Sequence, residues 1–460
     1  MVQEVAIPQH TDNVLQFVPF ISLPVELVTE ICTHLGLPAL HALRLTCRSL
    51  FITTADTCRR RTFRSICVLL TTDGLHRLSE LSMQEGICEH VESLMVVPEL
   101  FNGEYNAPYS TFSRWDCIQG ALGTSQQEQD SEQVDGKAYY AVYEAAMADH
   151  QHALTSATSI ILLQDCMRRF VNLSSVGLQY CPTAGTGDTC LGWRRFRAQL
   201  GFYPDFERER FPHKQIAREH DLAFSLLAEA LIASGRKVKR LSTCGPHCYG
   251  VGLGRMQLTP EAWASFLSCL KGLSHLHFRH ESSAISSHPE RLSDLLAAVA
   301  PSLETRRYQI GPYSSSIYRE PFRVRGLFQG IPFQRLQTVR LRLIELPMDT
   351  LEQFLRAVSP TLQILTLRAI SLAEPDDPSD PLPQDMEEET KHHWWRLLEF
   401  IRDELNLRFF VLRKVMFKKN PLGIVDRSFT WARYEHNLAV FHHRRSGLSF
   451  HEWMNQLRLK

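Results

Sequence analysis

The chain has no excess of charge of either sign. Its 460 residues include 50 Lys and Arg and 50 Asp and Glu side chains, so its formal net charge at neutral pH is zero. A strongly basic chain is drawn to nucleic acid or to an anionic membrane surface by its overall electrostatic field, and this chain has no such field. We therefore expect that neither nucleic acid nor a membrane is its partner, and that any role for charge is local.

Long hydrophobic runs are also missing, and we expect no secretory leader. No stretch approaches the roughly 18 apolar residues of a membrane-spanning helix, and the best, Asp221 to Ser234, is interrupted by Glu229. The first residues contain Glu4 and no basic cluster, unlike a signal peptide. The 12 cysteines are scattered singly, apart from Cys244 and Cys248. These features predict reduced thiols and a cytoplasmic or nuclear location, or both.

Catalytic signatures are absent as well. The sequence contains no G-x-S-x-G, H-E-x-x-H, P-loop or kinase motif. Cys244 and Cys248 resemble half of a zinc site that His275 or His277 could complete. Structural zinc sites usually use two short-spaced pairs of ligands, and the second pair here consists only of histidines in a predicted strand. We expect a protein that is not an enzyme and that holds neither a metal nor a cofactor.

The most informative stretch is an amphipathic segment near the amino terminus. Its first helical pattern has an apolar residue at every fourth position, namely Leu23, Leu27, Ile31 and Leu35. A second pattern follows Gly36 and contains Leu37, Leu40, Leu43 and Leu45. Two or three short helices cannot bury this much apolar surface among themselves. Part of it must face the rest of the chain or a groove on a partner protein.

The order of residues in this segment resembles the F-box. The matching positions are Leu23-Pro24-x-Glu26-Leu27, Ile31, Leu35, Leu40, Leu43-Arg44-Leu45, Cys47-Arg48 and Leu50. The resemblance implies a three-helix module at about residues 20–62 that docks on the small Skp-family adaptor and, through it, on the cullin and RING subunits of a ubiquitin ligase. Its candidates for the adaptor contact or the supporting core are Leu23, Pro24, Leu27, Ile31, Leu35, Leu40, Leu43, Cys47 and Leu50. In the alternative interpretation, the segment is a helical hairpin that packs on the main core.

A leucine pattern then repeats along the chain. Residues 336–346 and 362–372 both read L-x-x-Φ-x-L-x-x-I-x-L, where Φ is apolar, and a third copy begins at Leu407. Weaker copies begin at Val91, Leu173, Val238 and Leu273, and a candidate for a further copy begins at Leu303. The central alternation is typical of a strand. Helical patterns stand between copies, at residues 261–270, 292–299, 351–358 and 394–405.

Units of strand, turn and helix predict an α/β fold, with an irregular leucine-rich-repeat-like solenoid over residues 63–460 after the F-box-like module. A generic α/β domain is the alternative. We expect a flexible tail at residues 1–18 and disordered loops at 123–137 and 374–389, because these loops are polar and have little to bury.

Basic residues recur at two positions of the leucine pattern. The seventh position holds Arg279, Arg342, Arg368 and Arg413, and the fifth holds His277, Arg307 and Arg340. Neighbouring strands lie about 4.8 Å apart, so these residues would form a file wherever copies are adjacent. Arginine suits bidentate contact with carboxylate or phosphate. We hypothesise that this face binds an acidic or phosphorylated segment of a protein substrate; the alternative is that the arginines stay solvated or pair with local Glu.

These features predict the substrate-receptor subunit of an SCF-type cullin–RING E3 ubiquitin ligase, which itself does no chemistry. One alternative is an F-box-like interaction scaffold without ubiquitin transfer. The other is an enzyme with an unrecognised site, which a cleft with strongly perturbed titratable groups would favour.

Overall fold

The computed structural model describes most of the chain and divides it into two compact units. The described residues are 22–98, 136–179, 190–200, 213–243, 250–280, 289–310, 322–323, 328, 330–373, 386–413, 416–417, 420–421, 424–426, 438–442, 449–455 and 457–459. The first unit is Met1–Arg64 and the second is Ser65–Lys460. The division falls close to residue 62, where the sequence analysis ends the N-terminal module.

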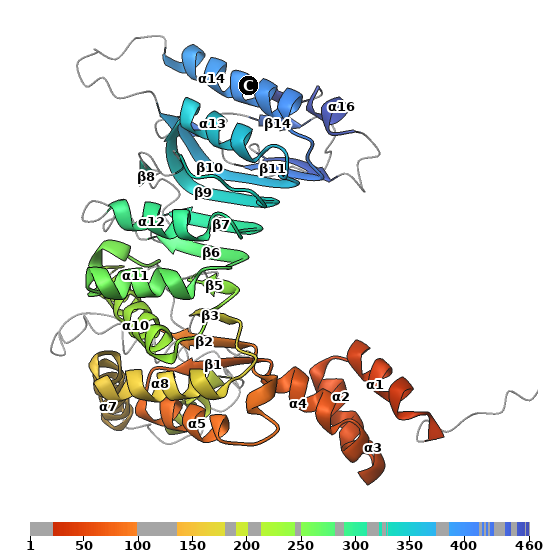
Figure 1. The fold of residues 1–460 in the computed structure, drawn as a ribbon, viewed down its shortest axis with the longest axis vertical. Helices are drawn as coiled ribbons and strands as arrows, with labels where there is room; N and C mark the ends of the chain where they lie inside the picture. Colours follow the sequence, from red (N-terminus) through yellow and green to blue (C-terminus); the bar gives the residue numbers. More distant parts are fainter. Residues whose placement is uncertain are drawn as a thin grey trace, which may run out of the picture. The chain divides into compact units, whose positions relative to one another are not determined.

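The described part of the N-terminal unit is helical. Its elements are α1 (Val25–His34), α2 (Leu37–Arg44), α3 (Arg48–Thr53) and α4 (Ala55–Phe63), one helix more than the predicted three (Figure 1). Gly36 separates the first two helices and is the N-cap of α2, whose first turn contains Pro38. Pro24 is the N-cap of α1. The apolar core of the unit is small and consists of Val28, Cys32, Leu40, Leu50 and Cys58.

The second unit is built on a long, mostly parallel sheet. Nine strands follow one another in chain order: β1 (Ser65–Leu69), β2 (Ser93–Val97), β3 (Ser175–Leu178), β5 (Arg240–Ser242), β6 (His275–His280), β7 (Thr305–Ile310), β9 (Thr338–Pro347), β10 (Ile364–Ala373) and β11 (Phe409–Arg413). Each of the eight copies of the leucine pattern forms one of these strands. The ninth, β1, is an additional strand that the pattern did not predict. The predicted α/β fold with adjacent parallel strands is therefore confirmed.

Short strands complete the described sheet. β4 (Cys190–Leu191) pairs with β1, while β8 (Phe322–Arg323) and β12 (Met416–Phe417) pair with β9 and β10, all three in parallel. At the other end, β13 (Asn420–Pro421) and β15 (Leu438–His442) are antiparallel to β12 and β11. A separate antiparallel pair is formed by β14 (Ile424–Asp426) and β16 (Leu457–Leu459).

Helices follow most of the strands and pack along one face of the sheet (Figure 1). They are α5 (Thr72–Ser82), α7 (Gly136–Thr155), α8 (Ala157–Arg169), α9 (Trp193–Leu200), α10 (His213–Ser234), α11 (Pro260–Cys269), α12 (Pro289–Val299), α13 (Met348–Val358), α14 (Met386–Glu404) and α16 (Phe450–Met454), with short 3-10 helices at Cys88–His90 and Leu253–Arg255. Each of the four predicted helical patterns lies in one of them, namely α11, α12, α13 and α14. Thr259 caps α11, because its hydroxyl accepts a hydrogen bond from the Ala262 N–H.

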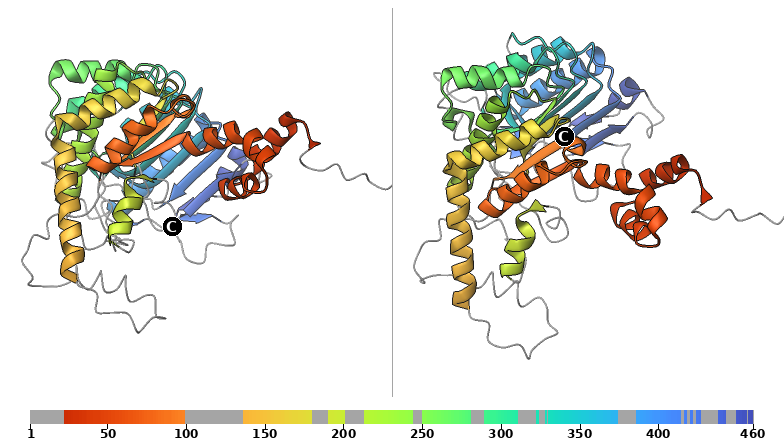
Figure 2. Two further views of the ribbon diagram at one scale, coloured as in Figure 1. Left: turned by 90° about the horizontal axis from the view of Figure 1, so that it is seen from below. Right: turned by 60° about the horizontal axis from the view of Figure 1, so that its bottom comes forward.

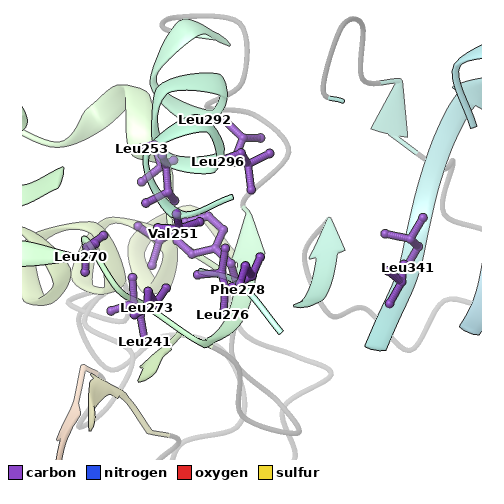
Figure 3. Close-up of a cluster of buried hydrophobic side chains, with 14 of the residues drawn as sticks. Leu241, Val251, Leu253, Leu270, Leu273, Leu276, Phe278, Leu292, Leu296 and Leu341 are labelled. Atoms are coloured by element: carbon purple, nitrogen blue, oxygen red, sulfur yellow. The ribbon is translucent and has the colours of Figure 1, made fainter. Parts of the chain in front are cut away.

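The leucines of the pattern fill the space between sheet and helices. Leu276 and Phe278 on β6 lie against Leu292 and Leu296 of α12 (Figure 3), and all four side chains are buried. Residues of equivalent position on the next strands, such as Leu341, are also buried. Each strand and helix thus covers its neighbour, and one continuous core runs through the second unit. Figure 2 shows the same layers from two other directions.

Helices begin inside the carboxyl ends of both predicted disordered loops, 123–137 and 374–389. Residues 136 and 137 already belong to α7, and residues 386–389 form the first turn of α14. The remainder of both predicted loops, 123–135 and 374–385, lies outside the described residues, as does the predicted tail at 1–18.

Candidate functional site

Strand register brings basic residues of five neighbouring strands together. His277, Arg307 and Arg340 are direct register partners across β6, β7 and β9. Arg342, Arg368 and Arg413 are direct partners across β9, β10 and β11. The two rows meet on β9, where Arg340 and Arg342 are two residues apart and so project to the same face of the sheet. We call these six residues the arginine band.

The band lies on the face of the sheet opposite the leucine core. On β9, Val339 and Leu341 are buried, whereas Arg340 is exposed and Arg342 is partly exposed. Arg307 is also exposed, and His277, Arg368 and Arg413 are partly exposed. Because the same alternation recurs on each strand, the fold presents these polar groups on one surface.

Arg279 does not belong to this surface, which corrects the prediction. It occupies the seventh position of its strand, as expected, but its side chain is only 1% exposed. Residues Thr243 and Val251 bond to this end of β6: the Arg279 N–H donates to the Thr243 hydroxyl, and the Val251 N–H donates to the Arg279 carbonyl, both at 2.9 Å. The next seventh position holds Gln309 on β7. The band therefore passes through the fifth position on β6 and β7.

Burial and the closely spaced positive charges of the arginine band lower the pKa of two of its members, His277 and Arg413. Burial and then the charge of Arg307 lower the pKa of His277 to about 4, with smaller contributions from His275, Arg340 and Arg240. Burial and the neighbouring Arg368 lower the pKa of Arg413. His277 is therefore neutral at physiological pH, and its imidazole serves as a hydrogen-bonding group beside the arginines.

Three members of the band have no carboxylate partner among the described residues. Within the described part of the chain, no residue forms a hydrogen bond or an ion pair with the side chain of Arg307, Arg340 or Arg368. Like charges directly opposite each other on neighbouring strands are destabilising, so a bound anion would relieve the repulsion between the register partners Arg307 and Arg340. Helix arginines differ, since Arg356 and Arg396 both pair with Glu352, at 2.9 and 3.2 Å.

The N-terminal unit carries a second candidate surface, which is apolar. Of the nine large hydrophobic side chains that are exposed among the described residues, six belong to this unit, namely Val25, Leu27, Ile31, Leu45, Phe51 and Ile52. Such a concentration on so short a segment is typical of a protein interaction site. The Arg44 guanidinium lies 4.4 Å from the ring centre of Phe51, which remains half exposed.

The predicted adaptor-binding residues divide into three groups. Pro24, Leu27 and Ile31 are exposed, and Leu23, Leu35, Leu43 and Cys47 are partly buried against the small core. Leu40 and Leu50 are buried in that core, so they support the fold and cannot contact a partner directly. Val25, Leu45, Phe51 and Ile52 are also exposed but were not among the predicted residues, because the four-residue spacing does not show which side of a helix faces inward.

The described residues include no candidate metal site, and one polar pocket is found outside the arginine band. Cys244 and Cys248 lie outside it, and within it no group of three His, Cys, Asp or Glu residues is arranged to hold a metal ion. A pocket of about 620 Å³ lies at the amino ends of β9, β10 and β11, with a polar lining that includes Glu304, Gln337, Gln363 and Arg408. It is separate from the arginine band.

Comparisons with known proteins add no family assignment. No protein-family model matches the chain, and a search of curated proteins finds no significant match. Among the described helices, none combines the length and apolar character needed to cross a membrane.

Proposed function

We propose that the chain is the substrate-receptor subunit of an SCF-type cullin–RING ubiquitin ligase. In this proposal, residues 22–64 are an F-box-like module that binds the Skp-family adaptor, and residues 65–460 are an irregular leucine-rich-repeat-like domain that holds a protein substrate. The chain is not itself an enzyme. It acts by holding an acceptor lysine of the substrate close to the ubiquitin carrier of the ligase, since proximity alone raises the rate of a bimolecular step.

The observation that carries the proposal is the exposed apolar surface of the N-terminal unit. Leu27 and Ile31 match the F-box pattern and lie on α1 with 52% and 36% of their surface exposed. Their neighbours Val28 and Cys32 fill the core instead. The helix is therefore anchored by one side and offers the other to a partner, which suits recognition of helices in a groove.

The second unit supports the proposal through its strand and helix units. Each copy of the leucine pattern forms a strand beside the preceding copy, and its leucines face the helices. Stacked units of this kind present a long sheet face, which repeat proteins use for binding. Here that face carries the arginine band, so the proposed substrate contributes an acidic or phosphorylated segment.

Co-purification with the Skp adaptor tests the proposal. The full chain should form a stoichiometric complex, and a Leu27→Ser/Ile31→Ser variant should lose it while keeping its unfolding midpoint, because both side chains are exposed. A matched Met83→Ser/Ile161→Ser variant changes two exposed apolar residues of the second unit and should bind normally.

The same experiment separates the alternatives. If the intact chain does not bind the adaptor, the ligase proposal is wrong. If it binds but a reconstituted ligase containing cullin, RING protein and ubiquitin carrier transfers no ubiquitin to a captured substrate, the chain is an interaction scaffold.

A further inference from the structure

We propose that the arginine band recognises two phosphate groups on one extended peptide segment, carried by residues with a single residue between them. This inference rests on the proposed function, because it specifies the substrate segment that the second unit would hold. It depends on the way the band divides into pairs of arginines.

The first pair is Arg307 and Arg340, and the second is Arg342 and Arg368. Both pairs consist of direct register partners on adjacent strands, β7 with β9 and β9 with β10. On the same three strands, the two other positions in register with these pairs hold uncharged residues. Gln309 on β7 lies opposite Arg342, and Thr366 on β10 lies opposite Arg340. On these three strands the charges therefore form two pairs, offset diagonally, and Arg413 on β11 extends the second pair as the register partner of Arg368.

Paired arginines favour phosphate over carboxylate. A single guanidinium satisfies both oxygens of a carboxylate through two parallel hydrogen bonds. A phosphate monoester has three strong acceptor oxygens and a charge of about −1.5 to −2 at neutral pH. Two guanidinium groups about 4.8 Å apart at their backbones can share its oxygens and balance its charge. Arg307 and Arg340, which have no described partner, are available for this contact.

The distance between the pairs determines the spacing of the phosphates. Their midpoints are one strand and two residues apart, which corresponds to about 8 Å, from a strand separation of about 4.8 Å and a rise of about 3.3 Å per residue. In an extended peptide, side chains two residues apart point to the same side at about 6.6 Å. Flexible phosphoserine side chains span the remaining difference. Phosphorylated residues separated by one residue therefore match the two arginine pairs.

Fluorescence anisotropy of the full chain with short Ala/Gly peptides tests the inference at physiological salt. The probes carry no phosphoserine, one phosphoserine at either position, two separated by one residue, or two separated by five. A peptide with Glu at both phosphoserine positions and a short single-stranded oligonucleotide of matched charge serve as additional probes. The closely spaced double phosphopeptide should bind about tenfold or more tightly than either single one, and the widely spaced peptide should resemble a single one.

Two double variants assign the binding to the pairs. Arg307→Gln/Arg340→Gln and Arg342→Gln/Arg368→Gln should each reduce the affinity for the double phosphopeptide to that of a single one. Arg335→Gln/Arg408→Gln removes the same charge at exposed positions outside the band and should leave the affinity within about twofold. An unchanged unfolding midpoint shows that each variant is folded.

The remaining outcomes overturn the inference in distinguishable ways. Equal affinity for single and double phosphopeptides would exclude two phosphate sites but leave an anion-binding surface. Equal or tighter binding of the Glu peptide or of the oligonucleotide would exclude phosphopeptide as the ligand class. If no anionic probe binds, the proposed substrate surface fails as well, whereas the adaptor proposal is judged separately by co-purification.

Discussion

Leu343 and Ala369 occupy equivalent positions on β9 and β10, and both have a left-handed backbone, with φ of 57° and 51°. The residues on either side remain in register, since Arg342 pairs with Arg368 and Ile344 with Ile370. The kink is thus shared by the two strands. It interrupts the alternation by one residue, so Ile344 follows Leu341 into the core after three residues instead of two. The two strands keep both their exposed arginines and their buried isoleucines because of it.

The first prediction concerns the strain at this kink. A left-handed conformation costs an L-residue about 1–2 kcal/mol, whereas glycine adopts it freely but loses more entropy on folding. We expect Ala369→Gly to leave stability unchanged or raise it by up to about 1 kcal/mol, measured by urea unfolding. Ala264→Gly, at an exposed position inside α11, should instead lower it by about 1 kcal/mol. A clear loss of stability in Ala369→Gly would contradict this explanation.

The second prediction concerns Arg306, whose fully buried side chain lies among three aromatic rings. Its guanidinium carbon is 4.4, 5.5 and 5.8 Å from the ring centres of Phe328, Phe333 and Phe354. Lysine keeps the charge but not the planar group that stacks on rings. We expect Arg306→Lys to lower the free energy of unfolding by about 1–2 kcal/mol.

The adjacent residue provides the control for this substitution. Arg307 is exposed on the other face of β7. Arg307→Lys should change the free energy of unfolding, measured by urea unfolding, by less than about 0.5 kcal/mol. Equal effects of the two substitutions would show that stacking on the rings contributes nothing.

The third prediction separates support from contact in the N-terminal unit. Leu40 has no exposed surface, so Leu40→Ala should cost the unit about 2–5 kcal/mol, while Leu45, which is 85% exposed, should tolerate serine within about 0.5 kcal/mol. Hydrogen exchange of residues 25–63 in the full chain measures both effects. If Leu40→Ala leaves the protection of the backbone amides in this unit unchanged, Leu40 is not part of the core that supports the unit.

The fourth prediction is a dependence of stability on acid. The pKa of His277 is about 4 in the folded protein and about 6.5 in an unfolded chain. Between these values the unfolded state binds more protons, so the contribution of His277 to stability is fully present above pH 6.5 and is lost as pH falls toward 4. After allowance for solvent screening, we expect a loss of up to about 2 kcal/mol.

A variant isolates this effect. His277→Gln should reduce the difference in urea stability between pH 7 and pH 4.5, and the exposed His76→Gln should not. If His277→Gln shows the same acid sensitivity as the unchanged chain, other groups are responsible.

Local patterns were sufficient to predict eight of the parallel strands and four of the helices that pack beside them. The leucines alternate with polar residues over each strand, and this period of two is readable without knowledge of neighbours. Equivalent positions of repeated strands become register partners when the strands are adjacent and parallel, which is why the arrangement of Arg342, Arg368 and Arg413 followed from counting residues. The same counting placed Arg279 in the band, where it does not belong.

The sequence by itself therefore determined eight of the strands, four of the helices, the order of these elements and the rows of basic residues, because these depend on periodicity along the chain. Only the tertiary structure decided which of these residues are accessible, because burial depends on segments far away in sequence. It placed Arg279 inside, surrounded Arg306 with three phenylalanines, and turned Leu40 inward while leaving Leu27 and Ile31 outside. It also required a left-handed residue at Leu343 and at Ala369, which no side-chain pattern announces, since neither is a glycine.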